Sequence, residues 1–137
     1  MKAFLDTSAL FKKYVNEPGS AKLDDLLDEI DEILVSPITK IELFSALDRR
    51  LQEKSIEPSQ AKAISHEIVT DMAFFGSVLW NSELEERTIN YVQKHHLKTF
   101  DALQLSSGHL SSCEVFVTSD KMLAKAAQKE LTKDIFL

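Results

Sequence analysis

The chain has 137 residues, 44% of them hydrophobic, and a formal net charge of −6 at pH 7. This length predicts a single domain over residues 1–137 that can bury one core without disulfide or metal support. The lone cysteine, Cys113, excludes an intrachain disulfide and favours a reducing compartment. No export signal or membrane-spanning apolar run is recognisable, so we expect a cytoplasmic protein with no membrane partner. The acidic balance argues against non-specific coating of nucleic acid but leaves local contacts open.

Five short apolar or β-branched runs are typical of β-strands. They cover residues 2–5, 33–36, 77–80, 114–118 and 134–137. Longer segments with helical spacing of apolar residues separate them, and residues 38–75 carry two such segments with a break near Glu57-Pro58. That break predicts a helical hairpin. The alternation of strands and helices predicts an α/β fold, with a parallel sheet covered by helices on both faces.

Acidic residues follow two of the predicted strands. Asp6 ends the first apolar run, in the stretch FLDTSAL, and Asp120 follows the run at 114–118. In open parallel sheets, ligands bind beyond the carboxyl ends of the strands, near the point where the strand order reverses. Glu42 and Asp101 stand near the starts of two predicted helices and would lie near the same edge. Four oxygen donors on one rim predict a site for a hard divalent cation such as Mg²⁺ or Mn²⁺.

Each of these acids also has a structural explanation. Asp6 and Asp120 are of the residue type favoured at helix N-caps. Glu42 follows Thr39 at the spacing of a capping box, and Asp101 would complement a helix dipole. Any one such coincidence is unsurprising in a chain with 22 acidic residues. The presence of all four at two strand ends and two helix starts favours a shared site.

Four segments of the sequence resemble the PIN-domain ribonucleases, and most closely the VapC-type toxins of toxin-antitoxin pairs. They are FLDTSALFKKYVNEPGS, TKIELFSAL, LKTFDALQLSS and VFVTSDKMLAKAA, in that order, and they span nearly the whole chain. The resemblance implies a three-layer α/β/α sandwich with a central parallel sheet. One departure is the segment SDKML, which stands where many relatives carry an aromatic residue and an arginine around the acid.

The resemblance also implies which residues do the chemistry. Asp6, Glu42, Asp101 and Asp120 match the family's acidic quartet, which binds Mg²⁺ or Mn²⁺ and catalyses hydrolysis of RNA. We expect Asp6 and Asp101 to bind metal directly, Asp120 directly or through water, and Glu42 to bind metal or position water. Supporting hydroxyls are expected from Thr7, Ser8 and Thr118. The implied partners are an RNA substrate, a cognate VapB-type antitoxin and a second copy of the chain in a homodimer.

Basic and apolar residues suggest where partners would bind. The candidates for contacts to the RNA backbone are Lys12 and Lys13, and less strongly Arg49 and Arg50. All four have the alternative of simply facing water. An apolar groove on the hairpin could receive a helix of the antitoxin, and Leu43, Leu47 and Leu51 are the candidates to line it. The alternative is that these three leucines belong to the core.

Three other functions fit parts of the sequence. The first is a non-catalytic PIN-fold domain that binds RNA or protein, although the presence of all four acids counts against it. The second is a phosphate-handling α/β domain such as a receiver or phosphatase, which the stretch DTS fits poorly. The third is a metal-free ribonuclease that uses His95 and His96 as acid and base. Attack by the 2′-hydroxyl would leave a cyclic phosphate, whereas metal-activated water would leave a 5′-phosphate.

Overall fold

A computed structural model of residues 1–137 contains a five-stranded sheet in which every strand pair is parallel. The strand order is β3-β2-β1-β4-β5. The strands are β1 (Lys2–Leu5), β2 (Glu32–Val35), β3 (Gly76–Ser77), β4 (Val115–Thr118) and β5 (Asp134–Phe136). The chain builds outward from β1 to β2 and β3, then crosses to the other side of β1 for β4 and β5. The strand order therefore reverses between β1 and β4, the position where ligands bind in open parallel sheets.

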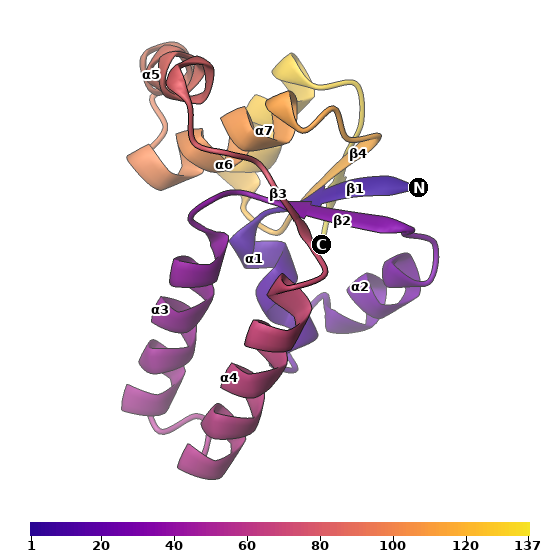
Figure 1. Ribbon diagram of the computed structural model, residues 1–137, viewed down its shortest axis with the longest axis vertical. Helices are drawn as coiled ribbons and strands as arrows, with labels where there is room; N and C mark the ends of the chain where they lie inside the picture. Colours follow the sequence, from indigo (N-terminus) through magenta and orange to yellow (C-terminus); the bar gives the residue numbers. More distant parts are fainter.

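Helices cover both faces of this sheet (Figure 1). One face carries α1 (Thr7–Leu10), the 3₁₀ helix η1 (Phe11–Lys13), α2 (Ser20–Leu27), α3 (Thr39–Gln52) and α4 (Pro58–Met72). The other face carries α5 (Ser82–His95), α6 (Thr99–Leu110) and α7 (Lys121–Glu130). This confirms the predicted three-layer α/β/α architecture. None of the helices combines the length and the apolar character needed to cross a membrane.

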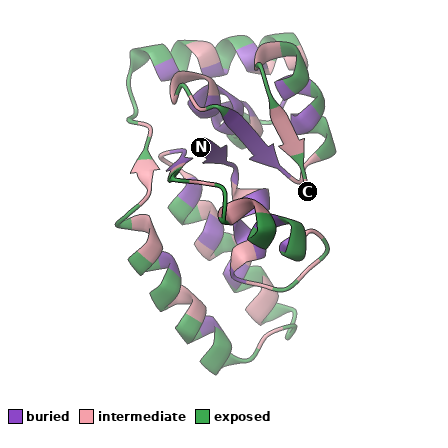
Figure 2. Ribbon diagram, turned by 90° about the vertical axis from the view of Figure 1, so that its right-hand side faces the viewer, coloured by how far each residue is buried: buried purple, intermediate pink, exposed green.

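The central strands separate two apolar cores. Successive side chains of a strand point to opposite faces, so Ala3 and Leu5 join the core beneath α1 to α4, while Phe4 joins the core beneath α5 to α7. Phe4 stacks on Phe116 of β4 with ring centroids 5.4 Å apart. Figure 2 shows β1 and β4 largely buried and the edge strands β3 and β5 partly exposed. The two buried strands β1 and β4 thereby fix the edge from which the acidic residues project.

The predicted helical hairpin is present as α3 and α4, which run side by side away from the sheet (Figure 1). Pro58 occupies the first turn of α4, and Glu57 and Gln60 form a capping box there. The apolar groove expected on this hairpin is wrong. Leu43 and Leu47 are buried in the core and cannot contact a partner, whereas Leu51 is partly exposed and packs against the edge of that core.

The third strand is shorter than the predicted run at 77–80. Only Gly76 and Ser77 pair with β2, after which the chain turns outward toward Asn81, the N-cap of α5. Leu79 and Trp80 are consequently exposed. A Cβ at position 76 would lie 2.6 Å from the end of the Leu34 side chain, so glycine leaves room for that side chain.

Candidate active site

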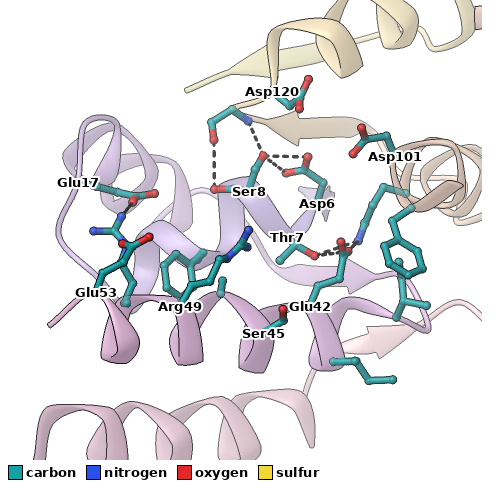
Figure 3. Close-up of a pocket in the computed structure, with 18 residues that line it drawn as sticks. Asp6, Thr7, Ser8, Glu17, Glu42, Ser45, Arg49, Glu53, Asp101 and Asp120 are labelled. Carbon is teal, nitrogen blue, oxygen red and sulfur yellow. Dashed lines mark hydrogen bonds and ion pairs between the residues drawn. The ribbon is translucent and has the colours of Figure 1, made fainter. Parts of the chain in front are cut away.

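The carboxyl ends of β1 and β4 open into a pocket of about 800 Å³. Asp6 directly follows β1, and Asp120 lies two residues beyond β4. Glu42 enters the pocket from α3, and Asp101 enters it from the first turn of α6. The structure therefore brings the four predicted acids, from four separate parts of the sequence, into one pocket (Figure 3).

Asp6 is the most buried of these acids, with 3% of its surface exposed. Burial raises the pKa of the Asp6 carboxyl to about 6, even though hydrogen bonds from Thr118, the Ala9 backbone and Ser8 act in the opposite direction. The nearby charge of Asp120 raises this pKa further. A carboxylate in this position is held in a fixed orientation at a cost in electrostatic energy, which a bound cation would relieve.

Two parallel chains of hydrogen bonds hold the Asp6 carboxylate. The backbone N–H of Asp120 donates to the Thr118 hydroxyl at 3.0 Å, and that hydroxyl donates to Asp6 at 2.6 Å. The backbone N–H of Ser119 donates to the Ser8 hydroxyl at 3.0 Å, and Ser8 donates to Asp6 at 2.8 Å. Two of the predicted supporting hydroxyls thus contact Asp6. They also tie the turn after β4 to the end of β1.

The third predicted hydroxyl, Thr7, contacts a different acid. It donates to Glu42 at 2.8 Å, and the Gln104 side-chain amide donates to the same Glu42 oxygen at 2.7 Å. The capping-box explanation for Glu42 is wrong, because α3 begins after Ile38 without a side-chain cap. Sequence reasoning missed Gln104. The available signal was its spacing of three residues from Asp101, which places both on one face of α6.

Replacing Gln104 with methionine should loosen Glu42. The substitution keeps the approximate volume but removes the donor to a partly buried carboxylate, so we expect a loss of about 1 to 2 kcal/mol in the free energy of unfolding. For the nuclease activity that the sequence resemblance implies, we expect a fall of about tenfold, the size seen when a group that supports a ligand is lost. Chemical denaturation and cleavage assays would measure both, with the exposed Gln93→Met on α5 as a matched control. A Gln104→Met protein equal to the control in both measurements would contradict this role.

Asp101 and Asp120 stand beside Asp6 at one end of the pocket (Figure 3). Burial raises the pKa of the Asp101 carboxyl, and the negative charges of Asp120 and Glu42 raise it further. One oxygen of Asp120 accepts from the Leu123 backbone N–H at 2.9 Å and caps α7, as the structural explanation predicts. Asp6 likewise caps α1 through the Ala9 backbone N–H. The cap uses only one Asp120 oxygen, so the second accepts no hydrogen bond from the protein. Neither oxygen of Asp101 accepts a hydrogen bond from the protein either.

The donor set of this pocket fits a hard divalent cation. All four acids offer carboxylate oxygens, which Mg²⁺ and Mn²⁺ prefer over nitrogen or sulfur. Asp6, Asp101 and Asp120 would hold such an ion, and their mutual repulsion provides the electrostatic reason for binding it. No three acidic, histidine or cysteine side chains form a preassembled ligand cluster, however. The carboxylates would have to move closer together to share one ion.

The preferred basic candidates lie outside this pocket. Lys12 is buried, and its ammonium donates to Glu17 at 3.1 Å and to the Pro18 carbonyl at 2.7 Å. Lys13 pairs with Glu67 and Asp71 of α4, at 2.8 Å each. Both lysines therefore hold the 3₁₀ segment η1 against its neighbours and do not face an RNA strand at the acids. Arg49 and Arg50, the less favoured pair, do line the pocket.

The two adjacent histidines are also remote from the acids. The His95 side chain is 7% exposed and bonds Glu130 at 2.8 Å, and Lys94 pairs with the same carboxylate. Burial tends to raise the pKa of Glu130, but the hydrogen bonds from Lys94 and His95 outweigh it and lower that pKa. His96 ends α5 in a left-handed conformation with φ of 54°. Neither histidine lines the acidic pocket, so the pair is not arranged as its acid and base.

This fold and pocket define an α/β domain with an acidic, cation-attracting site at the switch point of its sheet. The model of the PIN domain family matches residues 3–129, and the chain belongs to that family. PIN-domain toxins of the VapC type are generally nucleases, and PIN nucleases typically use divalent metal ions.

Solved structures with the same fold include toxins of toxin-antitoxin systems. A toxin-antitoxin complex from Klebsiella pneumoniae contains a chain 18% identical to this one, with a TM-score of 0.66 over 86% of each chain. VapC20 of Mycobacterium tuberculosis, a toxin that cleaves the sarcin-ricin loop, is 16% identical, with a TM-score of 0.71 over 90% of this chain and 94% of that chain. VapBC-1 from nontypeable Haemophilus influenzae is 13% identical, with a TM-score of 0.68 over 99% and 98%. At these identities the likeness shows the fold. No curated protein sequence matches the chain.

Proposed function

We propose that this protein is an endoribonuclease dependent on Mg²⁺ or Mn²⁺ that acts in the cytoplasm as the toxin of a toxin-antitoxin pair. The observation that carries the proposal is the meeting of Asp6, Glu42, Asp101 and Asp120 in one pocket, with Asp6 buried and fixed by two hydroxyls. Membership of the PIN family and the likeness to toxin chains support it. His95 and His96 do not line this pocket, and His95 pairs with Glu130, so the two histidines do not form the acid and base of a metal-free ribonuclease there.

The pocket's own residues would share the work of hydrolysis. Asp6 and Asp101 would bind the cation together, Asp6 fixed by Ser8 and Thr118 and Asp101 free of protein donors. Asp120 would contribute its free oxygen, directly or through water. Glu42, held by Thr7 and Gln104, would orient the attacking water or accept its proton. When bound, the divalent cation supplies Lewis acidity, lowering the pKa of a water and stabilising charge on the phosphate oxygens.

The ends of the cleaved RNA test this chemistry. Purified protein incubated with total RNA and Mn²⁺ should leave 5′-phosphate and 3′-hydroxyl ends, and EDTA should stop cleavage. A His95→Ala, His96→Ala double variant, checked for folding because His95 bonds Glu130, should leave the same ends. Cyclic-phosphate ends, or cleavage that persists in EDTA, would overturn the metal-dependent mechanism.

A cognate antitoxin is the partner we propose for silencing the enzyme. Since Leu43 and Leu47 are in the core, the apolar surface beside the acids comes instead from Ile41 and Phe100, which line the pocket and are 72% and 57% exposed. An antitoxin segment lying there could place an arginine among the acids and replace the cation. Inhibition that left Mn²⁺ affinity unchanged would contradict this replacement.

We also propose that the toxin forms a homodimer. Phe74, Leu79 and Trp80, next to the sheet edge at β3, remain exposed and are candidates for the contact between copies. Sedimentation velocity of the purified chain measures the assembly state. A monomer at high protein concentration would contradict the proposal.

A further inference from the structure

The pocket extends beyond the four acids along α3. Its far part is lined by side chains of both signs: Glu17, Arg49, Arg50 and Glu53. Figure 3 shows Arg49 reaching from α3 into the pocket, between Glu53 and the threonine and serine that follow Asp6. The charged end formed by these four residues has no role in holding the acids. Its two arginines are the only cations that line the pocket.

Arg50 is occupied by a structural ion pair. Its guanidinium pairs with Glu17, and it also lies over the Phe11 ring at 5.9 Å from the ring centroid. Glu17 at the same time accepts from the buried Lys12 at 3.1 Å. One carboxylate therefore neutralises part of two cations, and Arg50 is held between Glu17 and the Phe11 ring.

Arg49 has no such partner. Its side chain is exposed to the pocket and makes no ion pair or hydrogen bond within the protein. Glu53, the C-cap residue of α3, lines the same part of the pocket but does not pair with Arg49. Arg49 is thus the single pocket-lining cation with its donors available.

The position of Arg49 on its helix relates it to the acids. Glu42, Ser45 and Arg49 all line the pocket and follow one another at the spacing of one helix face. Seven residues separate Glu42 from Arg49, which corresponds to about 10 Å along the axis of an α-helix. A nucleic-acid strand with one phosphate at the acids can therefore run along α3 and present a neighbouring phosphate to Arg49.

We propose that Arg49 binds a backbone phosphate of the RNA strand next to the one that is cut, and thereby positions the strand across the acids. This assignment rests on the proposed function and names how the same site holds its substrate. A chain with a net charge of −6 repels RNA at long range, so a free cation inside the pocket is the group able to offset that repulsion locally. The planar guanidinium donates two parallel hydrogen bonds to phosphate oxygens, which fixes orientation as well as adding affinity.

Binding of RNA at several salt concentrations tests the assignment. We would use a fluorescein-labelled, mixed-sequence single-stranded RNA and an Asp101→Asn background, which prevents cleavage in every sample. The Arg49→Ala variant should bind this RNA about tenfold more weakly, the loss expected for a charge-assisted hydrogen-bond pair. The slope of log K against log salt should fall by about 0.7, the value for one phosphate contact on a single strand. Lys40→Ala, on the same helix but outside the pocket, is the control that removes an equal charge.

The outcomes separate this assignment from the proposed function. Arg49→Ala binding with the affinity and salt slope of Lys40→Ala overturns the role of Arg49, whereas the proposed function stands if wild-type protein still cuts RNA with Mn²⁺. Failure of the wild-type protein to cut any RNA, together with no binding in the Asp101→Asn background, overturns the proposed function and the assignment with it. An intermediate loss in Arg49→Lys, which keeps the charge but not the fork of donors, would support bidentate binding.

Discussion

Replacing Asp6 with asparagine should remove almost all of the proposed RNA cleavage and at the same time stabilise the fold above pH 6. The amide keeps the size of the carboxylate and the acceptor for the Ala9 backbone N–H, but it loses the charge that holds a cation. Metal-ion catalysis contributes several kcal/mol of transition-state stabilisation, so we expect cleavage to fall by roughly a thousandfold. A gain in stability together with a loss of activity distinguishes a functional acid from a structural one.

The expected gain in stability follows from the raised pKa of Asp6. The unfolded chain ionises near the ordinary value of 3.8, whereas burial keeps the folded carboxyl protonated up to about pH 6. Between these values the unfolded state has released a proton that the folded state retains, so the Asp6 contribution to stability falls as pH rises and stays low above pH 6. The shift corresponds to about 3 kcal/mol. The amide nitrogen cannot accept from the Thr118 hydroxyl as the second carboxylate oxygen does, which offsets part of this, and we expect a net gain of about 2 kcal/mol at pH 7.5.

Chemical denaturation across pH 4 to 8 without divalent metal isolates this effect. The difference in unfolding free energy between Asp6→Asn and wild type should grow through the window between 3.8 and about 6, then level off. Asp48→Asn, an exposed substitution on α3 outside the pocket, should show no such growth. A flat difference for Asp6→Asn, or a variant less stable than wild type at pH 7.5, would contradict the account of Asp6 as a buried, costly charge.

Replacing Gly108 with valine should cost about 3 kcal/mol or more, enough to remove much of the folded population of a domain of ordinary stability. Gly108 lies on α6 where the helix meets β4, and a side chain there would lie 2.5 Å from the Phe116 ring. That ring is fully buried and stacked on Phe4, so it has no room to turn away. Valine adds bulk at this contact and is a poor helix former.

The neighbouring Ser107 provides the matched control for Gly108→Val. Its hydroxyl is buried without a hydrogen-bond partner, so Ser107→Ala should leave stability unchanged or raise it slightly. Thermal unfolding of both variants, followed by circular dichroism, gives the comparison. A Gly108→Val protein that unfolds at the wild-type temperature would show that α6 does not approach β4 as closely as described.

The positions of the acids could be predicted from the sequence because they depend on local rules. Asp6 and Asp120 follow apolar runs that form neighbouring buried strands, and parallel strands end at the same edge of a sheet. Their capping of α1 and α7 could be predicted for the same local reason. The architecture followed from the alternation of strands and helices. Only the third strand differed from the prediction. It is shorter because the chain pairs with β2 at two residues and then turns away to reach Asn81.

The partners of polar side chains could not be predicted, because they depend on contacts between distant segments. Lys12 follows the stretch DTSAL and was therefore a candidate for binding RNA. In the fold its ammonium donates to Glu17 and to the Pro18 carbonyl, so it is not available. Arg50 loses its availability to the same Glu17, which leaves Arg49 free. Gln104 reaches Glu42 from another helix, and no local pattern pairs the two. Such pairings arise only when the fold brings the segments together.

Mn²⁺ binding, measured by the loss of the free-ion signal in electron paramagnetic resonance, tests most directly whether the acidic pocket is a metal site. The measurement needs no knowledge of the RNA substrate. Wild type and Asp48→Asn should bind Mn²⁺ with equal affinity, and Asp6→Asn and Asp101→Asn should each bind it more than about tenfold more weakly, since even residues that only support a ligand contribute that much. Equal Mn²⁺ affinity in all four proteins, or no binding by wild type, would contradict the assignment of this pocket as a metal-dependent nuclease site.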